Sequence, residues 1–319
     1  MNRIICGILK MLTFNYYFQR KRKNTLLILM FHQVNDKKTT FYPSMPIAAF
    51  KDLCYFIKKH YSVIKLSDID AHFSKTNKPA VVFSFDDGHY DIVEFALPIL
   101  SELGLPFNIN IDTEVLETAK PQDFVRVYDI LNNTEIETYM NRQFLSEPII
   151  INRDNPMETE NRFTHILSNL STKNKRTLIV DLAEKAKMKD EDYSKMLTLD
   201  DIKYLSTQNV EFGSHSHSHS ILTHLNRDQV HYELDHSKKI LENAIKRPIK
   251  VLAYPNGIYN TEIEKMAEDV GYKILLRTED KITHIESNKN PVKSYNRINQ
   301  YHQSVQEALA HTYKILKRK

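Results

Sequence analysis

A histidine-rich stretch is the first feature of this chain that could do chemistry. Residues 213–219 read GSHSHSH and place His215, His217 and His219 within five residues, in a chain that holds 14 histidines. The neutral imidazole is the commonest side-chain ligand for zinc-like ions. The stretch therefore predicts a metal site. Its spacings of two and four residues leave open which two histidines are the ligands.

Two adjacent carboxylates form a second candidate. Asp86 and Asp87 precede Gly88, and two ionised carboxylates are costly to bury together unless a cation is present. Adjacent side chains of an extended segment point in different directions, so one aspartate can bind a metal while the other accepts a proton. The alternative is a solvated turn, because Asp-Gly is a common turn dipeptide.

A third polar segment, residues 253–257, reads AYPNG. Its proline and glycine fix a tight turn whose backbone N–H groups can face a ligand, and an ordinary turn would carry the same residues.

One aspartate and two histidines would leave open positions on a metal, which is typical of catalytic sites. A second carboxylate beside such a metal is a candidate base for a water molecule. The three segments together favour a metal-assisted hydrolase.

Each polar segment follows a short apolar run that predicts a buried strand of a parallel sheet. The strands predicted in this way are 26–31, 79–85, 107–111, 210–212, 251–254 and 272–276, and the helices are 47–60, 92–103, 199–208, 228–244, 261–270 and 303–317. This alternation predicts an α/β fold, in which functional residues lie at the carboxyl ends of the strands. Helix 228–244 is expected to carry Glu233 and Lys239 on a polar face.

The βα pattern is interrupted at about residues 113–197, which are rich in Asn, Glu, Thr and Lys and include the predicted helix 176–187. We interpret this region as a largely helical insertion. Residues 26–319 otherwise contain no repeat and no long linker, which predicts one elaborated domain preceded by a separate segment, residues 1–25.

The composition excludes several classes of protein. Of the 319 residues, 41% are hydrophobic and 26% are charged, which is typical of globular proteins and rules out a wholly disordered chain. The net charge of +4 is too small for a nucleic-acid-binding surface built on one basic face. Two cysteines are too few for a cysteine-rich zinc site or a disulfide framework.

The N-terminal segment has an apolar run, residues 4–14, followed by a basic cluster, residues 20–23. A signal peptide has the opposite charge order and a small-residue cleavage site, so no cleavable signal is predicted. The run is too short to span a bilayer. We expect a surface helix, or peripheral membrane contact with the basic cluster at the headgroups, and a location in the cytoplasm or at the cytoplasmic membrane face.

At the level of motifs, the chain resembles the polysaccharide deacetylases with the NodB homology domain, carbohydrate esterase family 4. Residues 84–88 (SFDDG) resemble the family's T-F-D-D-G motif, and residues 212–222 resemble its G-x-H-[ST]-x-x-H-x-x-L motif. Residues 253–257 resemble its third motif in the Y-P-Y-G form. Residues 31–34 (FHQV) resemble the Y-H-x-V start of the branch that deacetylates poly-β-1,6-N-acetylglucosamine.

This resemblance implies a distorted (β/α)7 barrel that removes acetyl groups from a glycan. It implies a divalent metal, usually zinc and sometimes cobalt or nickel, held by Asp87, His215 and His219. Asp86 would take the proton from the attacking water. A backbone N–H near Asn256 would help to stabilise the oxyanion, and Tyr254 and Pro255 would line the substrate site.

Two departures from the family pattern affect the assignment. Ala253 stands where the third motif usually has the arginine that orients the catalytic aspartate. Arg297 fits that role by position, with Arg277 as the competitor. No convincing L-x-H motif is present, so His32 is the preferred general acid, ahead of His284 and His302.

The alternatives are an O-deacetylase of a surface glycan or lipid-linked sugar, and a non-catalytic glycan-binding protein of the same fold. Because all four motif residues that carry the chemistry are intact, the enzymatic interpretation is favoured. A phosphatase of the D-x-D kind is excluded, because the residue two after Asp86 is Gly88. The insertion would either cap the active-site face or make an oligomer contact.

Overall fold

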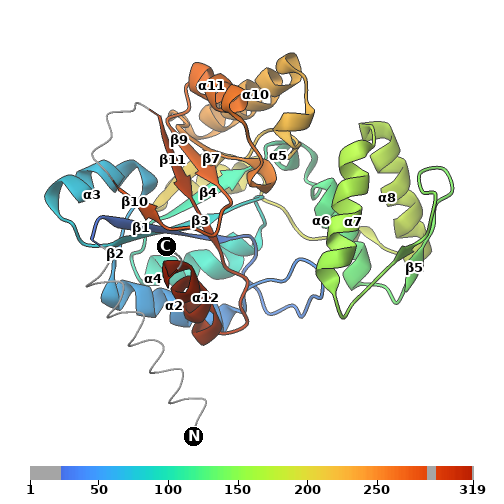
Figure 1. The fold of residues 1–319 in the computed structure, drawn as a ribbon, viewed down its shortest axis with the longest axis horizontal. Helices are drawn as coiled ribbons and strands as arrows, with labels where there is room; N and C mark the ends of the chain where they lie inside the picture. The colour runs from blue at the N-terminus through green and yellow to red at the C-terminus, as the bar shows by residue number, and fades with distance from the viewer. Residues whose placement is uncertain (1–22, 286–291, 318–319) are drawn as a thin grey trace, which may run out of the picture. The chain divides into compact units, whose positions relative to one another are not determined.

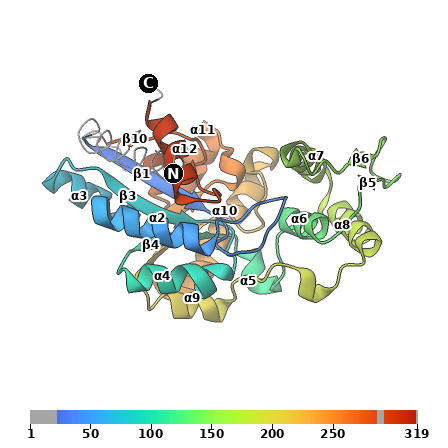
Figure 2. The same cartoon turned by 90° about the horizontal axis from the view of Figure 1, so that it is seen from below.

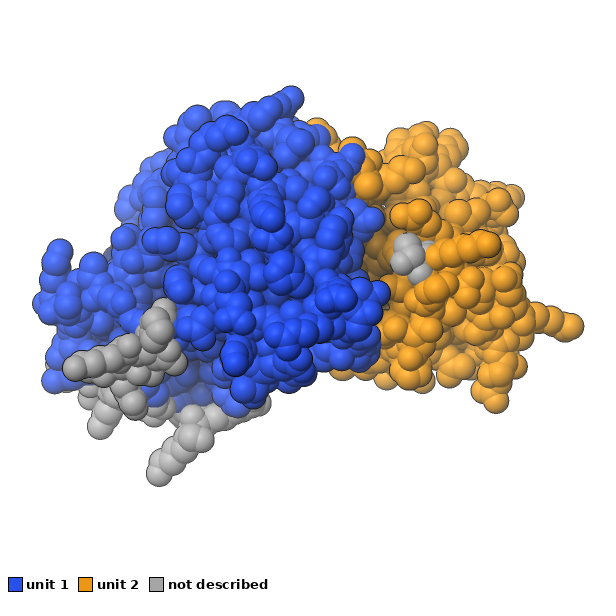
Figure 3. All heavy atoms as spheres, turned by 90° about the horizontal axis from the view of Figure 1, so that it is seen from above, with its two compact units in different colours: residues 1–36, 44–117, 197–319 blue, residues 37–43, 118–196 orange. Residues whose placement is uncertain are grey.

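The computed structural model describes residues 23–285 and 292–317 (Figure 1). They divide into two compact units, distinguished by colour in Figure 3. Unit 1 takes its residues from 1–36, 44–117 and 197–319, and unit 2 takes 37–43 and 118–196. The predicted apolar run of residues 4–14 lies outside the described residues. No helix of the described residues has the length and apolar character that a membrane span requires.

Unit 1 is built on a parallel sheet. Among the described residues, seven strands pair in parallel in the order β1-β3-β4-β7-β8-β9-β11. Their bounds are β1 (Thr25–Phe31), β3 (Ala80–Phe85), β4 (Phe107–Ile111), β7 (Val210–Ser214), β8 (Val251–Ala253), β9 (Ile274–Arg277) and β11 (Lys293–Asn296). These strands form the β-layer of the predicted barrel.

The two ends of the sheet are brought together at a single residue, Arg297. β11 pairs with β9, whereas β12 (Ile298–Asn299), which begins directly after Arg297, pairs in parallel with β1. The sheet is therefore nearly closed, and the predicted distorted (β/α)7 barrel is confirmed. Two short strands extend it: β2 (Ser62–Val63) pairs with β3, and β10 (Thr283–His284) pairs antiparallel with β1.

Helices follow the strands of unit 1 in the expected alternation. Their bounds are α2 (Ile47–His60), α3 (Ile69–Lys75), α4 (Leu97–Glu102), α5 (Glu114–Thr118), α9 (Leu199–Leu205), α10 (Arg227–Ile245), α11 (Thr261–Val270) and α12 (Val305–Lys317). α2 contacts both α4 and α12, and these helices are neighbours in Figures 1 and 2. Short helical turns cover Leu66–Asp68, Leu222–His224 and Pro255–Gly257.

The predicted helix over residues 92–103 is divided in the structure. A π-helical segment, Ile92–Ala96, precedes α4. Pro98 lies in the first turn of α4, where the missing N–H of proline is tolerated. The π-helical segment therefore ends at Ala96, and the regular helix α4 begins at the next residue, Leu97.

The barrel interior changes from apolar to polar along the strands. Leu26 and Ile28 of β1 and Ala80 and Val82 of β3 belong to one buried apolar cluster. Because alternate residues of a strand share a face, the next interior position of β3 is Ser84, and the one after it is Asp86. The carboxyl end of the barrel therefore carries the polar groups.

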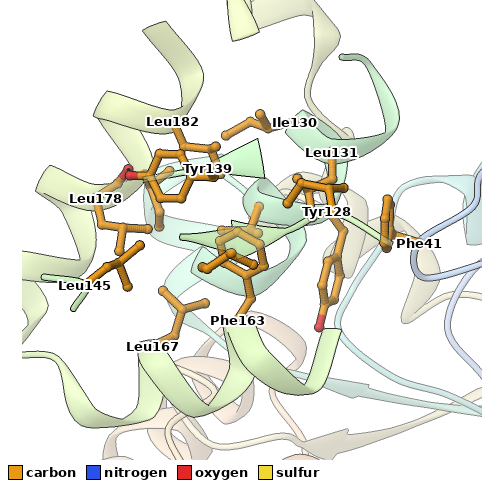
Figure 4. Packing of buried hydrophobic residues seen from close by; sticks show 14 residues of the cluster. Phe41, Tyr128, Ile130, Leu131, Tyr139, Leu145, Phe163, Leu167, Leu178 and Leu182 are labelled. Atoms are coloured by element: carbon orange, nitrogen blue, oxygen red, sulfur yellow. The ribbon is translucent and has the colours of Figure 1, made fainter. Parts of the chain in front are cut away.

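Unit 2 has its own apolar core, shown in Figure 4. It contains α6 (Asp123–Asn132), β5 (Thr138–Tyr139), β6 (Ile149–Ile150), α7 (Pro156–Asn169) and α8 (Thr172–Ala186). Phe41, from the distant segment 37–43, is fully buried in this core. The side chain of Asn132 accepts hydrogen bonds from the backbone N–H groups of Thr40 and Phe41, each at 3.0 Å. The segment 37–43 is thereby joined to α6.

Candidate active site

The two adjacent aspartates follow β3 and separate at a tight turn. The N–H of Gly88 donates to the carbonyl of Asp86 at 2.9 Å, and Asp87 between them has a φ of 69°. This is the rare form of the three-residue turn, and it is strained for a residue with a side chain. Both residues are 1% exposed. The turn directs the two buried carboxylates to different partners.

Asp86 is held by two side chains from other strands. Arg297 Nη1 donates to its Oδ1 at 2.6 Å, and Asn110 Nδ2 donates to the same oxygen at 2.8 Å. Burial opposes ionisation of Asp86, but the charge and hydrogen bond of Arg297, together with the nearby His215 and His32, outweigh burial and lower the pKa of this carboxyl well below its usual value. Asp86 is therefore an ionised carboxylate at neutral pH.

Of the two candidate arginines, Arg297 is the one beside Asp86. Its side chain is completely buried at the junction of β11 and β12, and Nη2 also donates to Thr278 Oγ1 at 3.3 Å. Arg277 instead donates to Glu264 at 2.6 Å and lies over the ring of Tyr259. The geometry thus gives Arg297, and not Arg277, the position expected of the orienting arginine.

Asp87 faces two histidines of the loop that follows β7. Its Oδ1 lies 3.4 Å from His215 Nε2 and 3.5 Å from His219 Nε2. Three potential ligand atoms, one from each residue, lie within 4.8 Å of one another. The structure therefore brings Asp87 together with the pair of histidines that are four residues apart.

The hydrogen bonds of His215 suit it for metal binding. Its Nδ1 lies 2.8 Å from the carbonyl oxygen of Ala253, which can only accept a hydrogen bond, so Nδ1 carries the proton. Nε2 then presents its lone pair toward Asp87. A metal-ligating histidine commonly donates its other N–H to a carbonyl in this way.

His219 is also suited to be a ligand. Burial lowers its pKa to about 4, so the imidazole is neutral at neutral pH. Ligation requires the neutral ring. One carboxylate and two neutral imidazoles are a donor set that fits zinc or a similar ion.

The loop carrying these histidines is anchored by Glu233 of α10. One carboxylate oxygen, Oε2, accepts the backbone N–H groups of His217 and Ser218, each at 2.8 Å. The other oxygen, Oε1, accepts the hydroxyl of Ser218 at 2.6 Å. Glu233 was predicted to share a polar face of its helix with Lys239; in the structure the residue is only 6% exposed, and its carboxylate accepts these groups of the loop.

Asn110 is a second residue that sequence reasoning missed. The segment FNINI of β4 alternates apolar and polar residues, and this signal would have placed Asn108 and Asn110 on one face of the strand. Both side chains are buried, and each hydrogen-bonds to Ser84 Oγ, at 2.8 and 3.1 Å. A Cβ at Gly213 would lie 2.2 Å from Asn110 Oδ1. Glycine at this position therefore leaves room for the asparagine that holds Asp86.

His32 lies near both aspartates. Phe31 and Phe85 are the last paired residues of β1 and β3. His32 directly follows Phe31 and Asp86 directly follows Phe85, so both residues stand just beyond the same end of the two strands. The charge of His32 is among those that lower the pKa of Asp86 and Asp87. His89, which sequence reasoning did not single out, is 2% exposed and also acts on Asp87.

The third polar segment follows β8. Tyr254 is completely buried and stacks on Tyr259 with ring centroids 5.1 Å apart, so its ring belongs to the core rather than to an open surface. Pro255 is also buried. Asn256 is exposed and has a φ of 54°. Of the three predicted substrate-site residues, Asn256 alone reaches the surface.

Part of the chain matches a known protein family in sequence. The family model described as polysaccharide deacetylase matches residues 154–275, which include the histidine loop and the segment 253–257. The Bacillus subtilis protein YxkH, named for polysaccharide deacetylation, is 32% identical over 83 residues. That match covers 26% of this chain and 30% of YxkH.

Solved structures of low sequence identity share the fold. A Streptococcus pyogenes deacetylase, PplD, in complex with acetate has a TM-score of 0.60 and 18% identity, over 91% of this chain and 99% of PplD. A de-N-acetylase from Aggregatibacter actinomycetemcomitans has a TM-score of 0.53 and 15% identity, over 89% of this chain and 99% of its own. These structures show that the chain shares the fold of these deacetylases, and the family model adds a sequence match over residues 154–275.

Proposed function

We propose that this protein is a metal-dependent deacetylase that hydrolyses the N-acetyl groups of an N-acetylhexosamine-containing polysaccharide or glycan precursor. The observation that carries the proposal is the convergence of Asp87, His215 and His219 beside an Asp86 that is paired with Arg297. The similar fold of a protein described as a de-N-acetylase supports an amide substrate.

Asp87 Oδ1 and the Nε2 atoms of His215 and His219 would hold the ion, with zinc the expected metal and cobalt or nickel as substitutes. When bound, such an ion polarises a carbonyl oxygen and makes water a stronger acid. The nine-tenths or greater burial of these side chains excludes bulk water from the ligand atoms.

Asp86 is assigned the role of the base. Its Oδ1 is already occupied by Arg297 and Asn110, whereas Oδ2 lies 3.7 Å from His215 Nε2 and so faces the metal ligands. Oδ2 would accept a proton from the attacking water as the water oxygen bonds to the acetyl carbon. Arg297 fixes the carboxylate for this transfer.

His32 is assigned the role of the acid. The carbon–nitrogen bond of the tetrahedral adduct breaks only when the nitrogen receives a proton, because an amide anion is a poor leaving group. His32 stands at the carboxyl end of β1, next in register to Asp86, from which it can supply that proton. The products are acetate and a free amino sugar. A backbone N–H near Asn256 is the proposed oxyanion donor.

Acetate release from N-acetylglucosamine oligomers tests the proposal. The purified chain is incubated with β-1,4- and β-1,6-linked oligomers in the presence of zinc or cobalt, and in parallel with a chelator. We expect acetate release that requires the metal. Release only from O-acetylated sugars would replace the proposal with an O-deacetylase, and no release with zinc bound to the protein would contradict both.

Two variants separate metal binding from proton transfer. Asp87→Ala is expected to lose this metal and the activity together. Asp86→Asn is expected to keep the metal and lose turnover, because the amide is isosteric with the carboxylate and cannot accept the proton. Full activity of Asp86→Asn would exclude Asp86 as the base.

A further inference from the structure

The third histidine of the GSHSHSH loop belongs to a second cluster of potential metal ligands. One ligand atom from each of Glu117, His217 and His236 lies within 4.8 Å of the other two. The three residues come from separate elements, namely α5, the loop after β7, and α10. None of them belongs to the group formed by Asp87, His215 and His219.

The backbone of the loop directs His217 away from its neighbours. Ser216 and His219 both have left-handed backbone conformations, with φ values of 68° and 55°. These interrupt the regular alternation that would place His215, His217 and His219 on one face. His217 Nδ1 instead lies 2.9 Å from Thr113 Oγ1, which leaves Nε2 as the nitrogen for a metal.

The ring of His236 is also fixed in position. It stacks on Tyr232, with ring centroids 4.7 Å apart and an interplanar angle of 18°. It meets the ring of His217 edge-on, with centroids 4.7 Å apart and an angle of 77°. His217 and His236 are partly exposed and Glu117 is exposed, so an ion can reach the cluster from solvent.

We propose that Glu117, His217 and His236 form a second divalent-metal site of this protein. Two imidazoles and one carboxylate are a zinc-type donor set, whereas magnesium and calcium prefer sites made of oxygen atoms. The ion would link α5 and α10 to the loop that also carries His215 and His219. It would therefore hold in place the loop that presents the first set of ligands.

The number of zinc ions bound per chain tests this directly. The full-length protein is dialysed against zinc and its metal content is measured by mass spectrometry. We expect two ions per chain for the unmodified protein and one for either His236→Ala or His217→Ala. His231→Ala is the matched control, because His231 is an exposed histidine on the same helix, and it should keep two ions.

The two sites can be tested independently of each other. Asp87→Ala should keep one ion, and Asp87→Ala/His236→Ala should keep none. If His236→Ala binds as much zinc as the unmodified protein, the second site does not exist. If His236→Ala loses one ion while Asp87→Ala loses none, the second site stands and the assignment of the first site fails.

Thermal unfolding gives a readout without enzymatic activity. An ion that binds only the folded arrangement of three elements raises the melting temperature. In the Asp87→Ala background we expect zinc to raise the Tm and magnesium to leave it unchanged. The rise should be absent from Asp87→Ala/His236→Ala. An equal rise in both proteins would show that zinc binds elsewhere and would overturn the proposal.

Discussion

Arg297 and Asp86 are 211 residues apart in the sequence, and Arg297 Nη1 donates to Asp86 Oδ1 at 2.6 Å in the structure. The contact exists because β11 and β12 flank Arg297 where the barrel closes, while Asp86 directly follows β3 at the same edge of the sheet. Both side chains are buried, so each charge depends on the other for compensation.

Removal of Arg297 should therefore affect both stability and turnover. Arg297→Ala leaves a buried carboxylate uncompensated, which costs about 3–5 kcal/mol in the free energy of unfolding. We expect kcat to fall by about 10²-fold or more, because the base loses its orientation, with the zinc content of the folded protein unchanged. Urea unfolding, kinetics of acetate release and metal analysis measure the three quantities.

Arg277→Ala is the control for this experiment. Arg277 pairs with Glu264 and not with Asp86, so its loss should leave kcat within a few-fold of the unmodified enzyme. An equal loss of kcat in both variants would show that Arg297 has no specific role in orienting the base.

His32→Ala should slow the hydrolysis of amides far more than that of activated esters. Protonation of the leaving group by a positioned acid contributes about 10²–10⁴-fold, and a good leaving group does not need it. The comparison uses acetate release from an N-acetylated oligomer and from an aryl acetate. An equal loss on both substrates would mean that His32 is not the acid.

His284→Ala is the matched control, and the structure explains why. His284 pairs in register with Thr25 at the first residue of β1, whereas His32 follows its last residue. At about 3.3 Å per residue the two ends of this strand are about 20 Å apart. His284 is therefore too far from Asp86 to protonate the same substrate nitrogen.

Local sequence patterns predicted the elements of unit 1 well. The spacing of Phe50, Leu53, Phe56 and Ile57 predicted the helix Ile47–His60, which the structure confirms residue for residue. The strand Phe107–Ile111 and the helix Thr261–Val270 are confirmed in the same way. These elements depend on periodicity and on glycine or proline at their ends, both of which are local properties.

Features that depend on long-range contacts could not be predicted. Glu233 has the appearance of a surface residue in the sequence, and only the loop folded against α10 makes it a buried acceptor. Likewise, the polar segment 37–43 gave no sign that Phe41 packs into the core of unit 2. The choice between Arg277 and Arg297 depended on where the barrel closes, which no local pattern encodes.

His302 should make the stability of the protein depend on pH. Burial and the neighbouring His311 lower the pKa of His302 to about 4, below the usual value of 6.5. The neutral ring is thus favoured in the folded state. The contribution of His302 to the free energy of unfolding is therefore complete above pH 6.5 and is lost as the pH falls toward 4. Between pH 7 and pH 5 the loss should be about 1 kcal/mol, because the ring is only partly buried.

Urea unfolding of His302→Gln at pH 7 and pH 5 tests this. Gln does not titrate, so the difference in unfolding free energy between the two pH values should be smaller by that amount than in the unmodified protein. His231→Gln, on the exposed face of α10, should leave the difference unchanged. An identical pH dependence in His302→Gln and the unmodified protein would show that His302 does not contribute.

Glu233→Gln should weaken metal binding at the first site without touching a ligand. Its carboxylate Oε2 accepts two backbone N–H groups between His215 and His219, and its Oε1 accepts the Ser218 hydroxyl. The amide NH₂ of Gln cannot accept a hydrogen bond, so at least one of these groups loses its partner and the loop relaxes. Residues that support metal ligands in this way typically contribute about 10–100-fold to affinity. Zinc affinity measured by competition with a chelator, in the His236→Ala background so that one site remains, should fall by that factor.

Asp235→Asn is the control, because Asp235 lies on the same helix and pairs with Lys239 at the surface. If Glu233→Gln keeps the zinc affinity of its parent, the loop does not depend on this anchor, and the local backbone at Ser216 and His219 alone positions the ligands.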